Sequence, residues 1–340
     1  MNYFKYKDKK DIMEELISAF PANITEAIEI ANASNFRKPN KPIHNIVICG
    51  MGGSGIGGGL VSSWVEDELN VPVITVKDYM LPKFVSENTL VIGSSYSGNT
   101  EETTSSVKEA ITRGAHIIGI CSGGALKTIC EENGFDVVVV PGGNPPRTAL
   151  AFSIIQLLNI LTRLGLISPG RLNELEKSRE LIVSNELEIK KTAREVAAFL
   201  KGNVGILYGT SKYEPVLVRA RQQFNENGKL LCWHHAIPEM NHNELVGWGG
   251  GDDRFAVVFF MPEDVHPRNA KRIEISREVI SKKTSKIFEI HAKGNSTIER
   301  SIYMINVVDW ASLYLSEIKN VDPVDIEVID YLKGELANFN

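Results

Sequence analysis

A run of glycines directly after a short apolar segment constrains the fold of this chain more than any other feature. The segment Asn45–Cys49 has the character of a buried strand, and the glycine-rich run Gly50–Gly59 follows it at once. Glycine lets the backbone come close to an anion, and Ser54 adds a hydroxyl donor within the run. We expect a strand, a loop and a helix in sequence, with a loop that binds an anion. A tight turn that binds nothing is the alternative.

Apolar strand-like segments alternate with helical segments along most of the chain. The expected strands are 45–49, 71–76, 89–94, 116–120 and 136–140, then 204–208, 230–233, 255–261 and 287–291. The expected helices are 11–20 and 24–33 with a break at Pro21, then 100–113, 148–164, 171–201, 215–225, 301–318 and 323–337. Such alternation is typical of parallel sheets with helices on both faces. We predict an α/β fold with two units of similar plan: residues 1–165, a helical connector at 166–200, and residues 201–340.

Charge and hydropathy exclude several classes of function. The net charge is −5, with 37 Lys and Arg against 42 Asp and Glu, which argues against a nucleic-acid partner. No apolar run approaches the roughly 20 residues of a membrane span. The N-terminal stretch Met1–Lys10 is polar, and no apolar segment follows it as a signal peptide requires. The four cysteines form no C-x-x-C pair. We therefore expect a cytoplasmic protein without a membrane partner.

A second loop, Ser94–Glu102, follows a predicted strand and opens a predicted helix. Its hydroxyl residues Ser95, Ser97 and Thr100 surround a glycine, at the place where a helix has unpaired backbone N–H groups. Thr100 could instead be a simple helix cap. A cap uses one hydroxyl, whereas this loop offers three, so the pattern favours a phosphate monoester held without a metal.

The glycine run also matches a dinucleotide fingerprint, Gly50-x-Gly52-x-x-Gly55. The acidic residue expected near the end of the second strand is only approximately present, as Asp78. An NAD(P)-dependent oxidoreductase therefore stays open as an alternative, although it does not explain the hydroxyl loop. A P-loop is excluded because no Lys-Ser or Lys-Thr follows the glycines.

The two loops together resemble the sugar isomerase (SIS) domain. Four later motifs, in the same order, resemble the bifunctional phosphoglucose/phosphomannose isomerase family: 145–147 (PPR), 225–229 (NENGK), 239–244 (EMNHNE) and 309–315 (DWASLYL). The resemblance implies two SIS-type units, a hexose 6-phosphate substrate, a role in carbohydrate metabolism, and neither cofactor nor metal. It implies that phosphate is bound by Gly53, Ser54, Ser95, Ser97 and Thr100.

The same resemblance implies the catalytic residues. Glu226 would carry the proton between C1 and C2, and Arg147 would stabilise the enediolate. His242 would assist ring opening from the neighbouring subunit, which implies a homodimer. Lys333 would be a second ring-opening group. Val324 stands where many members have Thr, which puts mannose activity in doubt.

Three further interpretations compete with this one. His234, His235, Glu239 and His242 fall close together, but Pro238 interrupts any helix that would align them as metal ligands, and the spacing is not H-E-x-x-H. A non-catalytic sugar-phosphate-binding SIS protein would leave Glu226 and His242 without a role. An aminosugar-phosphate isomerase differs from the leading interpretation only in its substrate.

Overall fold

The computed structural model describes residues 9–339, so most of the stretch Met1–Lys10 lies outside it. The described chain forms two compact units. The first-sheet unit contains residues 19–184 and 294–300, and the second-sheet unit contains 9–18, 185–293 and 301–339. The helical stretch at 166–200 divides between them at Asn185. Between residues 9 and 339, no helix is long and apolar enough to cross a membrane.

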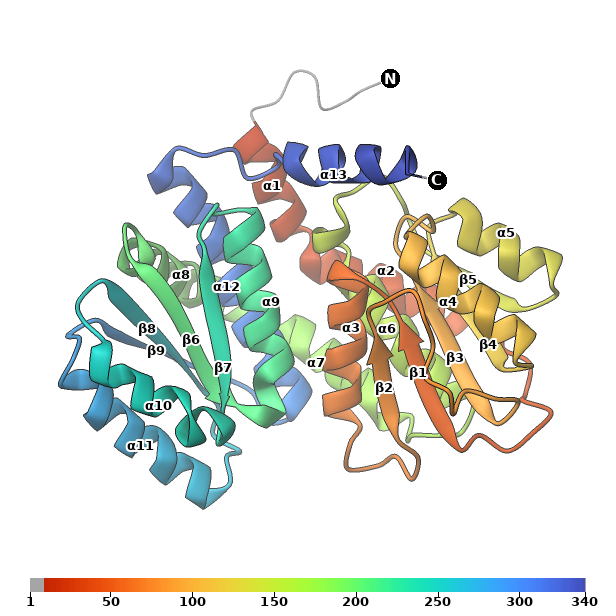
Figure 1. Ribbon diagram of the computed structural model, residues 1–340, viewed down its shortest axis with the longest axis horizontal. Coiled ribbons are helices and arrows are strands. Elements are labelled where there is room, and N and C mark those ends of the chain that lie inside the picture. The colour runs from red at the N-terminus through yellow and green to blue at the C-terminus, as the bar shows by residue number, and fades with distance from the viewer. Residues whose placement is uncertain (1–8, 340) are drawn as a thin grey trace. The chain divides into compact units, whose positions relative to one another are not determined.

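The first-sheet unit is built on five parallel strands in the order β2-β1-β3-β4-β5 (Figure 1). They are β1 (Asn45–Cys49), β2 (Val73–Val76), β3 (Thr89–Ser94), β4 (His116–Cys121) and β5 (Asp136–Val139). The chain leaves β1 toward one edge and returns to build the other side from β3. Ligands of such sheets bind at the carboxyl ends of the strands where the order reverses, here between β1 and β3.

Helices cover the first sheet on both faces. They are α2 (Phe20–Ala33), α3 (Gly52–Trp64), α4 (Glu101–Thr112), α5 (Gly124–Glu132), the 3₁₀ turn η2 (Pro146–Thr148), α6 (Leu150–Arg163) and α7 (Gly170–Ser184). Every residue of α6 from Leu150 to Leu161 is buried, because this helix packs against α2, α3 and α7. A helix that is apolar on all sides is stable only in such an interior position.

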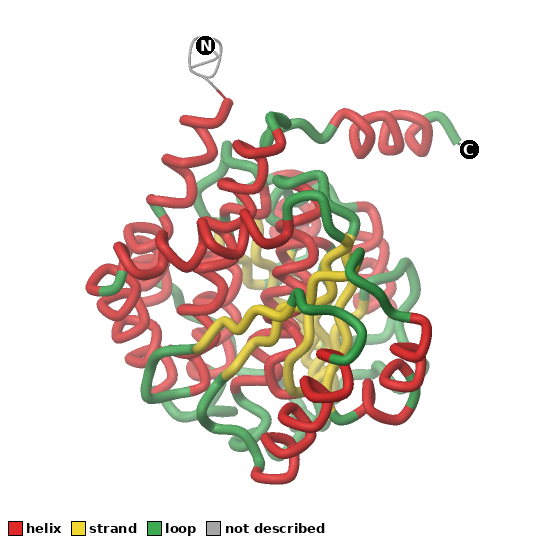
Figure 2. The backbone as a smooth tube through the Cα atoms, turned by 90° about the vertical axis from the view of Figure 1, so that its left-hand side faces the viewer, coloured by secondary structure: helices red, strands yellow, loops and turns green. Residues whose placement is uncertain are grey.

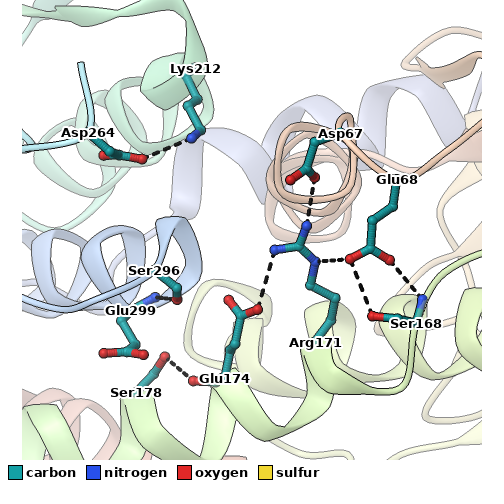
Figure 3. A network of polar contacts seen from close by, with 10 residues as sticks. All are labelled: Asp67, Glu68, Ser168, Arg171, Glu174, Ser178, Lys212, Asp264, Ser296 and Glu299. Carbon is teal, nitrogen blue, oxygen red and sulfur yellow. Dashed lines mark hydrogen bonds and ion pairs between the residues drawn. The ribbon is translucent and has the colours of Figure 1, made fainter. Parts of the chain in front are cut away.

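An ion-pair cluster ties the start of α7 to the chain just after α3 (Figure 3). Arg171 Nη2 lies 2.6 Å from Asp67 Oδ1, and its Nε lies 2.7 Å from Glu68 Oε1. Glu68 Oε2 also accepts a hydrogen bond from the Ser168 backbone N–H at 2.7 Å. The guanidinium is 13% exposed, so it is shielded from solvent more than an ordinary surface arginine.

The second-sheet unit has four parallel strands in the order β7-β6-β8-β9. They are β6 (Val204–Thr210), β7 (Cys232–Ile237), β8 (Phe255–Met261) and β9 (Ile287–His291). The helices are α1 (Lys9–Ser18), α8 (Glu186–Leu200), η3 (Ser211–Tyr213), α9 (Glu214–Glu226), η4 (Glu239–His242), α10 (Glu244–Gly247), η5 (Trp248–Gly250), α11 (Pro267–Ser281), α12 (Thr297–Lys319) and α13 (Glu327–Ala337). Helix α13 has no buried residue, and Figure 2 shows it extending beyond the end of α12.

Each sheet carries its own apolar core. In the first, Val47, Val91 and Ile117 pack with Val107 and Ala110 of α4. In the second, Ile206, Val257 and Phe259 pack with Ile273 and Ile280 of α11. Both sheets are parallel throughout and have helices packed against them, so the predicted α/β class with two units of similar plan is confirmed.

Three local predictions were wrong in detail. Pro21 does not separate the first two helices: the break is at Ala19, and Pro21 lies in the first turn of α2, where a missing N–H costs nothing. The stretch 171–201 is two helices that meet at Asn185. The strand expected at 230–233 is β7, which starts at Cys232 because Lys229 adopts a left-handed turn with φ +48°.

Candidate active site

The glycine loop joins β1 to α3 and packs tightly against two neighbouring segments. A Cβ on Gly50 would lie 2.9 Å from the Ser94 carbonyl oxygen, and one on Gly53 would lie 3.0 Å from the Pro146 carbonyl oxygen. Gly52 has φ +48°, a conformation that favours glycine. The N-cap residue of α3 makes no side-chain capping bond, so the first N–H groups of this helix have no acceptor from a capping side chain.

The hydroxyl loop is held in shape by its own side chains. The Ser95 hydroxyl donates to Thr100 Oγ1 at 2.8 Å, and Ser97 Oγ accepts from the Asn99 backbone N–H at 3.2 Å. Gly98 has φ +72°, and a Cβ there would lie 1.7 Å from the Gly123 carbonyl oxygen. Thr100 occupies the N-cap position of α4 but makes no side-chain capping bond. The structure thus places Thr100 where a helix cap lies, but its side chain does not cap the helix.

The two loops touch each other. The Tyr96 backbone N–H donates to Ser54 Oγ at 3.3 Å, which joins the first turn of α3 to the loop after β3. Arg147 in η2 is 4% exposed, and its Cα would lie 3.7 Å from a Cβ on Gly53. The carboxyl edge of the first sheet thus brings together all six of the predicted residues in this unit: Gly53, Ser54, Ser95, Ser97, Thr100 and Arg147.

Two polar residues that sequence reasoning missed lie at the same place. A small cavity of about 10 Å³, the size of one water molecule, is lined by Ser54, Tyr96 and Ser153 among others. Ser153 lies on α6, and its buried hydroxyl makes no hydrogen bond. The only signal for it is a serine within an apolar helix, which by itself does not point to a site. Burial raises the pKa of Tyr96, so its hydroxyl stays protonated at neutral pH.

Glu226 is the last residue of α9 in the second-sheet unit, and it is partly buried. The helix end that carries it is fastened to α12 by buried polar contacts. Arg219 and Gln223 both donate to the Asp309 carboxylate, with the Gln223 amide at 2.8 Å, and Asn227 Nδ2 donates to Ser312 Oγ at 2.9 Å. These contacts flank Glu226 on both sides along the chain, so they fix its backbone.

A buried ion pair anchors this arrangement. Arg219 is 2% and Asp309 7% exposed, and the guanidinium meets both carboxylate oxygens at 3.0 and 2.9 Å. Burial raises the pKa of Asp309, and the donors Arg219 and Gln223 counter that rise. A charge buried this deeply is stable only when such partners are present.

His242 is the last residue of η4, and its side chain is exposed. The residues beside it are fixed: Asn241 Nδ2 donates to Ser276 Oγ at 2.8 Å, and Asn243 Oδ1 accepts from the Glu244 N–H at 2.6 Å. Lys333 on α13 is exposed, and within residues 9–339 no hydrogen bond or ion pair joins it to Glu226 or His242.

Among the described residues, the two histidines within β7 and His242 in η4 form no metal cluster. In the part of the chain that the structure describes, no group of three or more His, Cys, Asp or Glu side chains is placed to hold a metal ion. His235 instead contacts Glu244, with Nδ1 2.7 Å from Oε2.

Two protein-family models match the chain. Residues 41–142 match the SIS domain, and residues 189–336 match the bacterial phospho-glucose isomerase C-terminal SIS domain. A bifunctional phosphoglucose/phosphomannose isomerase from Caldicellulosiruptor bescii is 38% identical, over 96% of this chain and 99% of that protein. One from Aquifex aeolicus is 36% identical, over 87% of this chain and 91% of its own length.

Among solved structures, the C-terminal domain of glucosamine-fructose-6-phosphate aminotransferase from Francisella tularensis superposes with a TM-score of 0.73. It is 15% identical and covers 95% of this chain and 99% of that chain, so it shows the fold alone. The sequence identity to the two isomerases, over most of each chain, shows the family as well as the fold. This chain belongs to the bifunctional phosphoglucose/phosphomannose isomerase family.

Proposed function

We propose that this chain interconverts glucose 6-phosphate, and also mannose 6-phosphate, with fructose 6-phosphate in the cytoplasm. The reaction moves a proton between C2 and C1 through an enediol or enediolate, with neither a metal nor a redox cofactor. Family membership supports the activity. The observation that supports the site best is the hydrogen bond between the Tyr96 N–H and Ser54 Oγ, because it joins the two loops that we propose bind the phosphate.

The phosphate group binds between the two loops. The N–H groups that begin α3 at Gly53 and Ser54 point toward it, and the positive end of the helix dipole favours an anion there. The hydroxyls of Ser95, Ser97 and Thr100 donate from the other side.

Arg147 stabilises the negative charge that develops during proton transfer. Its guanidinium keeps its charge at every accessible pH, and its 4% exposure limits screening by water. The short turn Pro146–Thr148 packs its backbone on Gly53. This places Arg147 beside the loop that binds the phosphate.

Glu226 takes the proton from C2 of the open-chain aldose and returns it to C1. The electron pair of the C2–H bond forms the C1–C2 double bond of the enediolate, and the carbonyl oxygen at C1 takes up the negative charge. His242 and Lys333 move the proton between the ring oxygen and the anomeric hydroxyl that opening of the ring requires. A histidine suits this step because it titrates near neutral pH.

The main test is a coupled assay of fructose 6-phosphate formation from each hexose phosphate, in the presence of a chelator. Glu226→Gln keeps the shape of the side chain and removes its basicity, so we expect kcat to fall by at least about 100-fold. Glu278→Gln, at an exposed position of α11, is the matched control. Turnover of Glu226→Gln near that of the wild type would defeat the proposal, as would loss of all activity to the chelator.

The assay also separates the alternatives. A non-catalytic binder would bind hexose phosphate without any turnover. An aminosugar-phosphate isomerase would prefer glucosamine 6-phosphate in the same panel. Val324→Thr, which restores the residue common in the family, tests whether this position controls the ratio of mannose to glucose activity.

We propose further that the enzyme is a homodimer in which His242 acts in the partner's site. The exposure of His242 supports this arrangement. Mixing inactive Glu226→Gln with inactive His242→Ala under subunit exchange would create one intact site per mixed dimer. Random exchange then restores about a quarter of the wild-type activity. No recovery in a sample shown to exchange subunits would place His242 in its own subunit's site.

A further inference from the structure

Three aromatic rings and one carboxylate line a pocket in the second-sheet unit. The pocket has a volume of about 200 Å³, and Trp233, Trp248, Phe255 and Glu244 line it together with Ile206 and the glycine segment 247–251. Ile206, Trp233 and Phe255 lie near the starts of β6, β7 and β8, so the pocket is at the amino ends of these strands. None of these residues has a role in the proposed isomerase site.

The rings of Trp233 and Trp248 each pack edge to face against the ring of Phe255. Trp233 and Trp248 each lie with their ring centroid 5.9 Å from that of Phe255, at an interplanar angle of 75°. Trp248 is 4% exposed, whereas Trp233 is 37% exposed and forms the rim. Lys283 Nζ donates to the Gly249 carbonyl at 3.1 Å and so tethers the glycine segment that closes one side. Faces of tryptophan rings attract cations more strongly than those of other aromatic residues.

Glu244 supplies a negative charge to this pocket. Its Oε1 accepts from Trp233 Nε1 at 2.9 Å and from the Tyr208 hydroxyl, both neutral donors, and its Oε2 lies 2.7 Å from His235 Nδ1. The Glu244 side chain is 25% exposed. Among residues 9–339, no lysine or arginine pairs with it. Within the described residues, the carboxylate is therefore fixed in place with His235, and neither a lysine nor an arginine, as its ion-pair partner.

The hydrogen bonds on Glu244 narrow the kind of cation that fits. A carboxylate has about four acceptor positions, and three are already used. A guanidinium would need two parallel acceptors, and a primary ammonium would bring three N–H donors into a pocket with mostly apolar walls. A quaternary ammonium has no N–H to satisfy, so it gains the electrostatic attraction without that cost.

Two other aromatic rings of this chain already have a cationic side chain of the chain itself over their face. Lys190 Nζ lies 4.2 Å from the centroid of Trp310, and Arg194 lies 4.4 Å from that of Tyr314. In the described part of the chain, no such cation lies over Trp233 or Trp248. We propose that the pocket of Trp233, Trp248, Phe255 and Glu244 binds the trimethylammonium group of a small ligand, independently of the isomerase reaction.

Calorimetric titration of the purified full chain at about pH 8, where an imidazole is uncharged as a rule, tests this proposal. The probes are choline, its neutral isostere in which carbon replaces the nitrogen, and methylammonium. We expect saturable binding of choline, at least about tenfold tighter than either of the other two. No saturable choline binding, or equal binding of the neutral isostere, would overturn the proposal.

Variants locate the site. Glu244→Gln and Trp233→Leu should each weaken choline binding about tenfold or more, while Glu274→Gln on the exposed surface of α11 leaves it unchanged. Thermal melts show whether each variant folds. Because Trp233 lies at the rim of the pocket, Trp233→Leu should destabilise the fold less than Glu244→Gln does. Choline binding that survives Trp233→Leu in a folded protein would also contradict the proposal. Because binding is measured without substrate, the result does not depend on the isomerase assignment.

Discussion

The hydroxyl of Ser95 is hydrogen-bonded to that of Thr100, with 2.8 Å between the two oxygens. Four residues lie between them in the chain, and the turn at Gly98 brings them together. Ser95 is 1% exposed, so it cannot turn away into solvent. Because the Ser95 hydroxyl donates to Thr100, the pair holds the Thr100 hydroxyl in a fixed place with its own proton free to donate, and at the proposed phosphate site this would lower the entropy lost on binding.

Thr100→Val removes one of these hydroxyls while it keeps the shape of the side chain. We expect the KM for glucose 6-phosphate to rise about 10-fold to 100-fold, because a donor to the phosphate is lost and the Ser95 hydroxyl loses its partner. Thr112→Val, at the exposed end of the same helix, is the control. An unchanged KM in the coupled assay would remove Thr100 from the phosphate site.

Asp309→Asn breaks the buried ion pair with Arg219 and leaves that guanidinium without a counter-charge. Loss of one partner from such a pair costs about 3 to 5 kcal/mol in the free energy of unfolding. Lys282→Ala, which breaks the exposed pair with Glu278, should cost less than about 1 kcal/mol. Urea denaturation followed by circular dichroism measures both. Similar losses of unfolding free energy in the two variants would mean that burial of the Asp309–Arg219 pair does not increase its contribution to stability.

Gly98→Ala should destabilise the protein by at least about 2 kcal/mol and impair phosphate binding. The residue has φ +72°, and a Cβ there would collide with the Gly123 carbonyl oxygen. Gly334→Ala is the matched control, because its Cβ would meet nothing within 4 Å on the exposed helix α13. That control should be neutral or stabilise by up to about 1 kcal/mol. A Gly98→Ala protein as stable as the control would show that the loop containing Gly98 can shift away from the Gly123 carbonyl without loss of stability.

Stability should rise with pH as His116 titrates. Burial lowers the pKa of His116 in the folded protein below its ordinary value near 6.5. As the pH falls below that ordinary value, the unfolded chain takes up a proton that the folded chain does not, so folding becomes less favourable. His116→Gln should flatten this part of the profile of unfolding free energy against pH. A profile with the same slope in wild type and variant would assign the effect to other groups.

Much of the fold follows from local sequence. The apolar run Asn45–Cys49 before the glycines predicts β1 with the bounds that the structure shows, and β3, β8 and β9 also begin and end as expected. β1, β3 and β8 lie inside parallel sheets and are buried along nearly their whole length, whereas β9 is an edge strand. The start of β7 differs because a left-handed turn at Lys229 decides it, and a lysine does not indicate such a conformation.

The sequence by itself determined where the residues of the proposed phosphate site lie, since Ser54, Ser95, Ser97 and Thr100 each follow a recognisable strand and therefore reach the same edge of one sheet. Only the tertiary structure decided which distant side chains meet: Asp309 with Arg219, Glu244 with Trp233, and Ser153 behind the glycine loop. The physical reason is that the spacing of residues along a strand or helix fixes which side they face. Which residues of other elements a side chain contacts depends on how whole helices and strands pack, and a local sequence pattern does not contain that information.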